Sequence, residues 1–419
     1  MIAFEQAQRI VIATSQRLPE AIVATAQAFG RVLASEISSP ENLPPFDNSA
    51  MDGFALICAG TTLVIEREFD ITGAIAAGDA PMTPRDGAVE IMTGAPMPSG
   101  FDGILPIEQA QILERDADGR PTRIRLLAEV VAGAHVRRCG QDVARGDSVL
   151  PAGMRVDAVA RMLLAALGIA DVRVLARPKV ALLCTGRELI DDLQQPLVPG
   201  QIRNSNGPFL ADRLAGLGAE ICLRETLPDD IDVFVAALHR ADVACADIVI
   251  STGAVSMGRY DFVPDALRQV GAEILFHKVA IRPGKPLLFA RLPSGAVYFG
   301  LPGNPVSSAV GLRFFVQPVL RAMQGLPIEM PLHLPLAHAI EKKPGLRFLQ
   351  KARVTLTGKG CLQVQLLSGQ ESFRIQPLLA ANAWALLPEA CERLSAGDLV
   401  EVFGLENDAL RISPENAAL

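Results

Sequence analysis

The chain has 419 residues, more than one hydrophobic core normally serves, so we expect several domains. Its 39 Lys and Arg stand against 46 Asp and Glu, and the net charge is −7, whereas a nucleic-acid-binding surface normally shows a basic excess. One Trp and two Tyr also leave few rings on which bases could stack. These counts argue against nucleic acid as a partner, and any anionic ligand must be held by a local group of cations.

The seven cysteines are dispersed without a C-x-x-C pair, and the five histidines form no cluster with the spacing of metal ligands. This pattern predicts free thiols in a reducing compartment and argues against a zinc site. The segment from Met1 to Glu5 lacks a basic region followed by an apolar core, and no apolar run reaches membrane-spanning length. We therefore expect a cytoplasmic protein with no membrane partner.

Apolar residues recur at helical spacing over residues 4–33, which predicts a helical opening. The positions that carry this pattern are Phe4, Ala7, Val11, Ile22, Ala26 and Phe29. Residues 54–136 instead show short apolar stretches between turns, and Asp118-Gly119 between two such stretches is a hairpin signal. Residues 150–167 return to a helical pattern.

These changes of pattern predict an interrupted amino-terminal domain. We expect residues 1–44 and 137–176 to form one elongated, helical and extended domain. Residues 45–136 would then be a small, mostly-β domain inserted into it.

From residue 177 to 325 the chain alternates apolar strands with amphipathic helices, which predicts an α/β sheet with helices on both faces. The expected strands are 180–184, 221–223, 248–252, 287–290 and 297–299, and the expected helices are 208–217, 231–239, 263–270 and 306–323. Residues 326–419 return to short strands, with turns at 358–360 and 397–398. We read them as a separate β-rich carboxyl-terminal domain.

Several loops are expected at the carboxyl ends of the strands, where ligands collect in open α/β sheets. They are residues 185–188, 252–261, 277–286 and 300–308. Their glycines allow close approach of backbone N–H groups to an anion, and the helix start at 306–308 is expected to add free donors. Lys278, Arg282 and Lys285 place three cations within eight residues. The combination predicts a site for phosphates or an oxyanion.

Carboxylates in the same strand-end loops predict a Mg²⁺ site, because this hard ion takes carboxylate and phosphate oxygens. The candidates are Glu188, Asp229, Asp230 and Asp261. Any one of them alone is more often a turn or a solvated residue, so the prediction depends on their convergence. A P-loop and a G-x-G-x-x-G turn are absent from the sequence, which argues against a dinucleotide cofactor.

Three further segments admit two interpretations. Residues 45–54, 93–98 and 140–142 are rich in small polar residues between ordered parts. Such segments form Asx turns and element starts, or they offer acceptors to a ligand. The residues alone favour the turn.

Three of these strings carry a resemblance to a known family. Residues 46–55, 91–98 and 300–307 resemble the signatures of the MoeA and gephyrin E-domain family, the molybdopterin molybdenumtransferases, and similarity continues in order along nearly the whole chain. The resemblance implies a four-domain, elongated homodimer whose active cleft lies between the α/β domain of one subunit and the inserted domain of the other.

The resemblance also implies the reaction, which is the final step of molybdenum cofactor assembly. Adenylylated molybdopterin and molybdate would be the substrates, and Mg²⁺-dependent cleavage would release AMP as metal enters the dithiolene. Partners implied in this way are the adenylyltransferase upstream and molybdoenzymes downstream.

Carried over residue by residue, the resemblance assigns three sets of functional positions. Catalytic roles would fall on Asp52, Thr93, Glu188, Lys278, Arg282 and Lys285. Substrate binding would fall on Asp142, Asn206, Thr252, Gly253, Ser256, Pro302, Asn304, Pro305, Ser307 and Ser372. Metal binding would fall on Glu188, Asp229 and Asp261. The chain departs from the family's usual residues at Arg187, Ala254, Arg282 and Lys351.

Two other functions compete with this interpretation. A molybdopterin adenylyltransferase resembles the α/β domain alone, so the presence of other domains argues against it. A non-catalytic pterin-binding scaffold or carrier would need no catalytic groups, whereas this chain retains Asp52, Glu188, Asp261 and Lys285. These residues favour catalysis.

Overall fold

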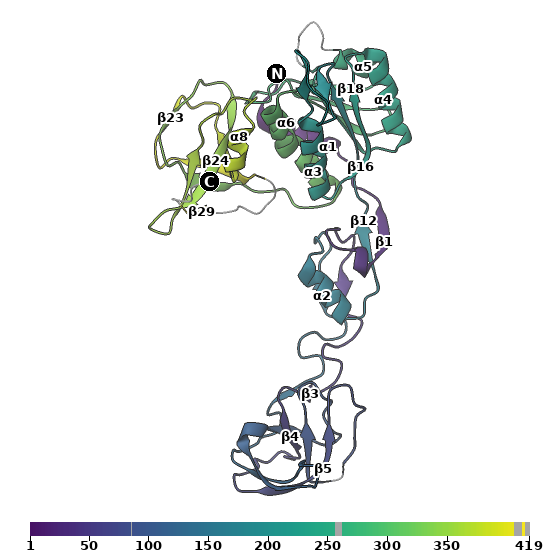
Figure 1. Cartoon of the computed structure of the whole chain (residues 1–419), viewed down its shortest axis with the longest axis vertical. Coiled ribbons are helices and arrows are strands. Elements are labelled where there is room, and N and C mark those ends of the chain that lie inside the picture. Colours follow the sequence, from purple (N-terminus) through teal and green to yellow (C-terminus); the bar gives the residue numbers. More distant parts are fainter. Residues whose placement is uncertain (85, 256–261, 406–412, 415–419) are drawn as a thin grey trace. The chain divides into compact units, whose positions relative to one another are not determined.

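The computed structural model describes residues 1–419 except 85, 256–261, 406–412 and 415–419 (Figure 1). By its contacts the chain divides into two units, Met1–Ala21 with Leu175–Leu419, and Ile22–Val174. Within the described ranges no helix has the length and apolar character needed to cross a membrane. The four domain boundaries expected from the sequence stay a prediction.

A six-stranded sheet forms the centre of the first unit, in the order β16-β13-β17-β21-β20-β18. Its parallel strands are β13 (Lys179–Thr185), β16 (Glu220–Leu227), β17 (Ile248–Thr252) and β21 (Val297–Leu301); β18 (Glu273–His277) and β20 (Leu288–Arg291) are antiparallel to their neighbours. Every residue of β17 and β21 is buried, as expected for strands covered on both faces. The strands expected from the sequence are confirmed.

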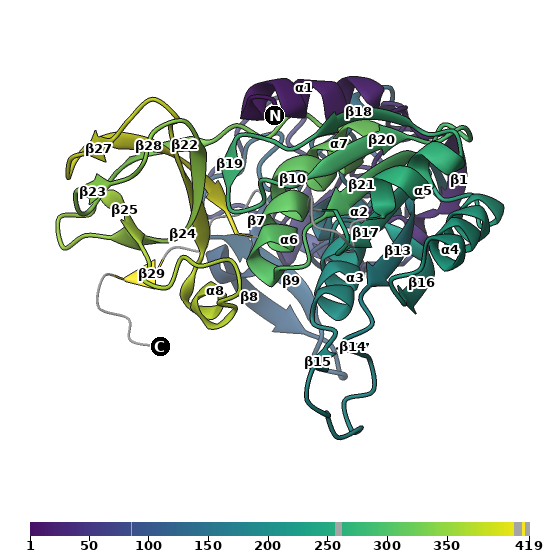
Figure 2. The ribbon, with the colours of Figure 1, turned by 90° about the horizontal axis from the view of Figure 1, so that it is seen from above.

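Helices cover both faces of this sheet (Figure 2). Val180 and Leu182 face one core, together with α1 (Phe4–Thr14), α3 (Asn206–Gly216) and α6 (Pro305–Gly311). Ala181 and Leu183 face the other core, with α4 (Ile231–Val243) and α5 (Val263–Gln269). Helix α6 continues through a π-helical turn, Leu312–Val316, into α7 (Gln317–Met323), so the expected helix over 306–323 is confirmed with one irregular turn.

The helical opening expected over residues 4–33 is wrong beyond Thr14. Residues Glu20–Ala24 form strand β1, which pairs with β12 (Asp171–Leu175), and a 3₁₀ turn follows at Thr25–Gln27. Pro19 supplies no backbone N–H and disfavours helix in the residue before it, so one continuous helix cannot run from Phe4 to residue 33. Ile22 and Phe29, which carried the second half of the pattern, are exposed.

The carboxyl-terminal part of the first unit is built on a second sheet. Its strands are β19 (Ile281–Arg282), β22 (Leu332–Pro335), β24 (Arg347–Leu356), β25 (Leu362–Leu366), β26 (Ala383–Leu387), β28 (Leu399–Gly404) and β29 (Ser413–Pro414), with β23 (Ile340–Glu341) and β27 (Arg393–Leu394) paired beside it and helix α8 (Gln376–Ala380). The predicted turn at 358–360 joins β24 to β25. Strand β19 comes from the α/β part of the chain and pairs with β24.

The second unit contains another six-stranded sheet, in the order β7-β4-β6-β5-β9-β8. Its strands are β4 (Gly53–Leu56), β5 (Glu68–Ile75), β6 (Ala88–Ile91), β7 (Gly103–Pro106), β8 (Ala110–Arg115) and β9 (Pro121–Leu126). Strands β8 and β9 form the predicted hairpin, and Asp116 accepts backbone hydrogen bonds within its turn.

The rest of this unit joins short strand pairs to one helix. The pairs are β2 (Ile37–Ser38) with β11 (Ser148–Leu150) and β3 (Asn48–Ser49) with β10 (Val136–Arg137). The helical pattern expected over 150–167 narrows to helix α2 (Ala158–Ala166).

Helix α2 begins at a cap that can be tested. The Asp157 carboxylate accepts from the backbone N–H of Ala160 at 2.8 Å. We expect Asp157→Ala to cost about 1 kcal/mol of local stability, so that α2 amides exchange roughly fivefold faster. Hydrogen exchange measures this, and Asp157→Ser should keep the wild-type rate because serine also caps. Equal exchange in the alanine variant would show that the cap contributes nothing.

Candidate functional site

A cleft of about 490 Å³ opens where β13, β17 and β21 end. From β13 the chain moves to β16 on one side and returns to β17 on the other, so the cleft lies at the point where the strand order reverses. Its walls come from several loops and one helix start. The lining residues are Thr185, Gly186, Glu188, Leu189, Ile202, Asn206, Asp229, Thr252, Gly253, Ala254, Val255, Pro286, Pro302, Gly303 and Asn304.

The floor of the cleft is fixed by hydrogen bonds between strand ends. The Thr185 hydroxyl donates to the Thr252 carbonyl at 3.0 Å, and the Gly253 N–H donates to the Leu301 carbonyl at 3.0 Å. Gly253 has φ of +94°, and a Cβ there would lie 2.5 Å from the Thr185 carbonyl oxygen. Only glycine fits this position without displacing the backbone.

Asn206 lines the cleft and carries an unsatisfied acceptor. Asn206 is the first residue of α3 and is 9% exposed. Its side-chain Nδ2 donates to the Gly303 carbonyl at 2.7 Å. Its Oδ1 atom is buried and has no hydrogen-bond partner among the described residues. A buried acceptor without a partner is costly, so a ligand N–H or O–H that reaches Oδ1 gains a hydrogen bond at little desolvation cost.

Two carboxylates line the same cleft. The Glu188 carboxylate lies over Gly186, 2.7 Å from the position that a Cβ on that glycine would take. Asp229 follows β16 and accepts from the Arg187 N–H at 3.3 Å. Mg²⁺ sites usually use oxygen ligands from one or two carboxylates, and phosphate oxygens of the substrate complete the coordination. The donor set therefore fits magnesium.

The other two acidic residues predicted for the metal site are Asp230 and Asp261. Asp230 caps α4, accepting from the N–H groups of Asp232 and Val233, and does not line the cleft. Asp261 and Ser256 lie outside the described residues. Across the described ranges no group of three or more His, Cys, Asp or Glu side chains could enclose a metal ion.

The three predicted cations belong to one loop beside the cleft, which we call the cationic loop (Lys278–Leu287). Its ends are paired by backbone hydrogen bonds from Lys278 to Leu287 and from Val279 to Lys285. Arg282 and Lys285 are exposed, and the Arg282 guanidinium stacks over the Phe348 ring at 5.3 Å. Within the described part, only Pro286 of this loop lines the cleft.

The cationic loop packs against the start of α6. A Cβ on Gly284 would lie 3.7 Å from the Ser307 carbonyl and 3.6 Å from Val310. The cations thus come from the loop that contacts α6, and the carboxylates come from the cleft beside it. The sequence did not separate these two regions.

The expectation that the amides of 306–308 are free donors is wrong for two of them. The Val306 N–H donates to the Ser372 carbonyl at 3.0 Å, and the Ser308 N–H donates to the Asn304 carbonyl at 3.0 Å. The loop that carries Ser372 precedes α8, so a distant part of the chain caps this helix. Pro305 is the first residue of α6, Ser307 is buried, and Ser372 is half-buried.

In the second unit, Asp52 and Thr93 form one polar pair. Asp52 Oδ1 accepts from the Thr93 backbone N–H at 2.7 Å and from its hydroxyl at 2.8 Å. These two hydrogen bonds, the backbone one first, lower the pKa of Asp52 below its ordinary value, so this exposed side chain stays negatively charged to lower pH. The pair is brought together by the ends of β4 and β6.

Other residues near this pair have structural roles. Asp47 accepts from the Cys139 N–H at 2.7 Å and pairs with Arg138 at 2.6 Å, while Asn48 and Ser49 form β3. Asp142 is exposed, and its backbone N–H donates to the Leu43 carbonyl at 2.9 Å. The turn interpretation therefore accounts for Asp47, Asn48 and Ser49, whereas Asp52 presents its carboxylate at the surface.

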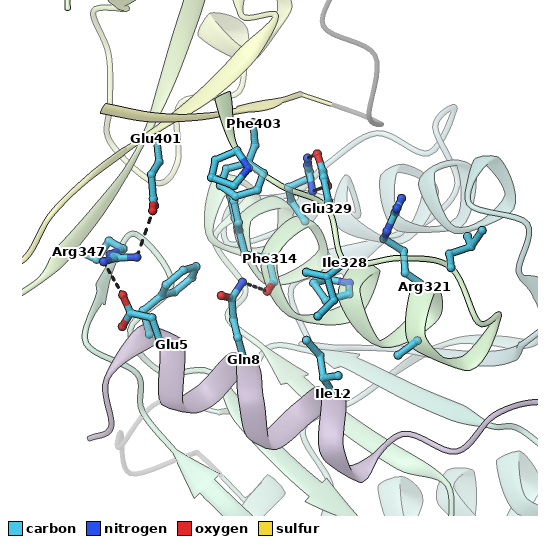
Figure 3. A pocket seen from close by; sticks show the side chains of 16 residues that line it. Glu5, Gln8, Ile12, Phe314, Arg321, Ile328, Glu329, Arg347, Glu401 and Phe403 are labelled. Atoms are coloured by element: carbon cyan, nitrogen blue, oxygen red, sulfur yellow. Dashed lines mark hydrogen bonds and ion pairs between the residues drawn. The ribbon is translucent and has the colours of Figure 1, made fainter. Parts of the chain in front are cut away.

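A second cavity of about 220 Å³ lies between α1, α7 and the carboxyl-terminal sheet (Figure 3). Phe4, Phe314 and Phe403 make its walls largely apolar. Its charged residues are already paired, for example Arg347 with Glu5 at 2.5 Å. It contains none of the residues predicted for the site and lies away from the strand ends, so we do not assign the chemistry to it.

The sequence interpretation missed the apolar wall of the cleft. Leu189 and Ile202 line it from β14 (Leu189–Ile190) and β15 (Ile202–Arg203), which pair in parallel. Strands of two residues carry no periodic pattern, so no sequence signal could have identified them. Thr185, at the end of the first predicted strand, could have been singled out from its position.

The fold defines a multidomain α/β protein. Its central sheet is accompanied by β-rich parts and has a preformed ligand cleft where the strand order reverses. Three family models match the chain: the MoeA N-terminal region (domain I and II) over residues 2–168, a probable molybdopterin binding domain over 181–322, and the MoeA C-terminal region (domain IV) over 333–405. The chain therefore belongs to the MoeA family, as the resemblance of its motifs predicted.

Relatives of full length support this assignment. A molybdopterin molybdenumtransferase of Synechococcus elongatus is 37% identical over 97% of this chain and 100% of its own length. One of Staphylococcus aureus is 34% identical over 97% of this chain and 96% of its own. The solved molybdopterin biosynthesis MoeA protein of Pyrococcus horikoshii is 27% identical, with a TM-score of 0.76 over 96% of this chain and 99% of its own. The predicted fold class is confirmed.

The hydrogen bonds of Asp52 lead to a pH prediction. Thr93→Val removes the hydroxyl donor and leaves the backbone donor, so we expect the pKa of Asp52 to rise part of the way toward the ordinary 3.8. Carboxyl NMR titration measures this. Thr93→Ser should keep the wild-type value, and an unchanged pKa in the valine variant would mean that the hydroxyl bond does not form in solution.

Proposed function

We propose that this protein is a molybdopterin molybdenumtransferase that inserts molybdate into adenylylated molybdopterin and releases AMP. The observation that carries the proposal is the cleft at the strand ends, which is lined by two carboxylates and by Asn206, a residue whose buried Oδ1 has no partner among the described residues. Family models that match nearly the whole chain also support the proposal.

The cleft is the proposed site of the phosphate linkage. Glu188 and Asp229 would hold Mg²⁺, which neutralises phosphate charge when bound. Thr252, Gly253, Pro302 and Asn304 form the neighbouring wall, where the glycine at 253 lets the end of β17 pack against Thr185. Asn206 would accept a hydrogen bond from the substrate, and this orients the substrate in the cleft.

The cationic loop is the proposed site of the oxyanion. Lys278, Arg282 and Lys285 supply positive charge beside α6, where Pro305, Ser307 and Ser372 lie. Cations placed there stabilise molybdate and the negative charge that develops as the phosphoanhydride breaks. The contact of the Arg282 guanidinium with the Phe348 ring favours one position of this charge.

Roles in the second unit rest on the resemblance. We propose that Asp52, whose carboxylate accepts hydrogen bonds from Thr93, orients water, and that Asp142 contributes to substrate binding. Ser256 and Asp261, outside the described residues, keep their proposed substrate and metal roles. The proposal includes a homodimer and a location in the cytoplasm, a reducing compartment in which the seven cysteines would stay unpaired. The upstream adenylyltransferase and downstream molybdoenzymes are its proposed protein partners.

Two neighbouring aspartates provide a matched test of the magnesium ligands. We expect Asp229→Asn to raise the Mg²⁺ concentration for half-maximal AMP release about tenfold or more, because it removes a carboxylate from the cleft. Asp230→Asn should leave that concentration unchanged, since asparagine also caps α4. Equal effects of the two changes would refute the assignment of Asp229.

The reaction itself is tested with purified protein, adenylylated molybdopterin, Mg²⁺ and molybdate. We expect AMP release together with reconstitution of a molybdoenzyme. ATP-dependent adenylylation of molybdopterin would instead identify an adenylyltransferase, and tight pterin binding without turnover would identify a scaffold. Either result would overturn the proposed function.

The oligomeric state is a separate prediction. Sedimentation at micromolar concentration should give the mass of a dimer of the 44.6 kDa chain. A monomer alone across this range would contradict the homodimer and leave the test of AMP release unaffected.

A further inference from the structure

Lys351 is a buried lysine that the proposed mechanism does not use. It lies in β24, and none of its surface is exposed. Its Nζ donates to the backbone carbonyls of Gly369 at 2.6 Å, Arg374 at 3.2 Å and Glu371 at 3.4 Å. An ammonium group has three protons, so these three acceptors use all of them. Lys351 therefore has no donor left for a substrate.

The three carbonyls belong to one segment, Leu367–Arg374, which we call the Ser372 loop. The backbone of Lys351 holds the same segment. Its carbonyl accepts from the Leu367 N–H at 3.0 Å, and its N–H donates to Gln370 Oε1 at 3.0 Å. Gln370 Nε2 donates back to the Lys351 carbonyl at 2.8 Å. Residue 351 is thus the main attachment of this loop to the sheet.

The Ser372 loop reaches the start of α6. The Ser372 carbonyl accepts from the Val306 N–H at 3.0 Å, and the next residue of the helix is Ser307. The cationic loop packs on the same part of α6 through Gly284. Three segments from different parts of the chain therefore meet at the proposed oxyanion site.

Burial of Lys351 has a physical cost that indicates a specific role. Removal from water lowers the pKa of its ammonium group. The three carbonyl oxygens around it are all acceptors, so the protonated form is the one that satisfies them. Without that group the carbonyls would be left unpaired, and a loop whose carbonyls lack donors separates from the core to reach water.

We propose that Lys351 is a positioning residue for the oxyanion site: its ammonium group holds the Ser372 loop on α6 and thereby fixes Ser372 beside Ser307. The proposal rests on the proposed function for its consequence in catalysis, and on geometry alone for the position of the loop. Lys351 acts through this loop and does not touch molybdate.

A second buried lysine in the same domain provides a matched control. Lys342 is 9% exposed, and its Nζ also donates to three backbone carbonyls, those of Lys343, Leu346 and Glu389. None of these carbonyls belongs to the Ser372 loop. Lys351→Met and Lys342→Met therefore each remove a largely buried ammonium group bonded to three carbonyls, and only the first removes side-chain hydrogen bonds to the Ser372 loop. Lys342 Nζ also lies 4.9 Å from the Phe348 ring that Arg282 contacts, and methionine keeps an apolar contact with that ring.

We expect Lys351→Met to raise the KM for molybdate about tenfold with kcat at saturating molybdate changed by less than about threefold, because the loss is one of positioning. Lys342→Met should keep the KM within about twofold. Equal increases in the two variants would show a general loss of stability and overturn the proposal. An unchanged KM in Lys351→Met would overturn it as well.

Hydrogen exchange tests the position of the loop without any enzymatic activity. The Val306 amide should exchange faster in Lys351→Met than in wild type or Lys342→Met, because its acceptor is the Ser372 carbonyl. Should Lys351→Met fail to fold, Gln370→Ala removes the two hydrogen bonds between the Gln370 side chain and the Lys351 backbone, and it should change exchange and KM in the same direction by a smaller factor. Wild-type exchange and KM in that variant would count against the proposal.

The proposed function and the positioning role of Lys351 can be refuted independently of each other. If wild-type protein releases no AMP, the proposed function fails, while equilibrium dialysis with molybdate alone still compares oxyanion binding in the two lysine variants. Weaker molybdate binding by Lys351→Met alone would then support the positioning role. Equal binding by both variants would overturn it.

Discussion

The reversal of strand order at β13 is the constraint on which the cleft depends. From β13 the chain passes through α3 to β16, and from β16 through α4 to β17 on the opposite side. Right-handed crossovers in opposite directions put α3 and α4 on opposite faces, as their separate cores require. The loops after β13 and β17 therefore diverge, and Asn206 and Gly253 meet across the opening between them.

The sequence predicted the central sheet well because its signals are local. Apolar runs such as 248–252 are strands buried on both faces, and amphipathic spacing marks the helices that cover them. The same reasoning failed beyond Pro19, where Ile22 lies in strand β1 and Phe29 in a turn after it. Local spacing cannot report a partner strand far along the chain.

The candidate site was predictable only where it follows directly from strand ends. Glu188, Thr252 and Asn304 lie together because parallel strands finish at one edge. The Ser372 carbonyl accepts from the Val306 N–H, and Lys351 is buried in β24. Both features depend on a sheet that forms from segments far apart in the sequence. Neither follows from residue type, because a lysine in a sequence is expected at the surface.

The insertion of the second unit into the first has a consequence for the order of folding. Helix α1 must join an α/β core whose next segment begins only after about 150 intervening residues, and closing a loop of that length is entropically costly. Pairing of β1 with β12 shortens the loop to a few residues. By the logarithmic dependence on loop length, this lowers the closure cost by about 3 kcal/mol. Prior folding of the inserted unit would therefore assist assembly of the core that flanks it in the sequence.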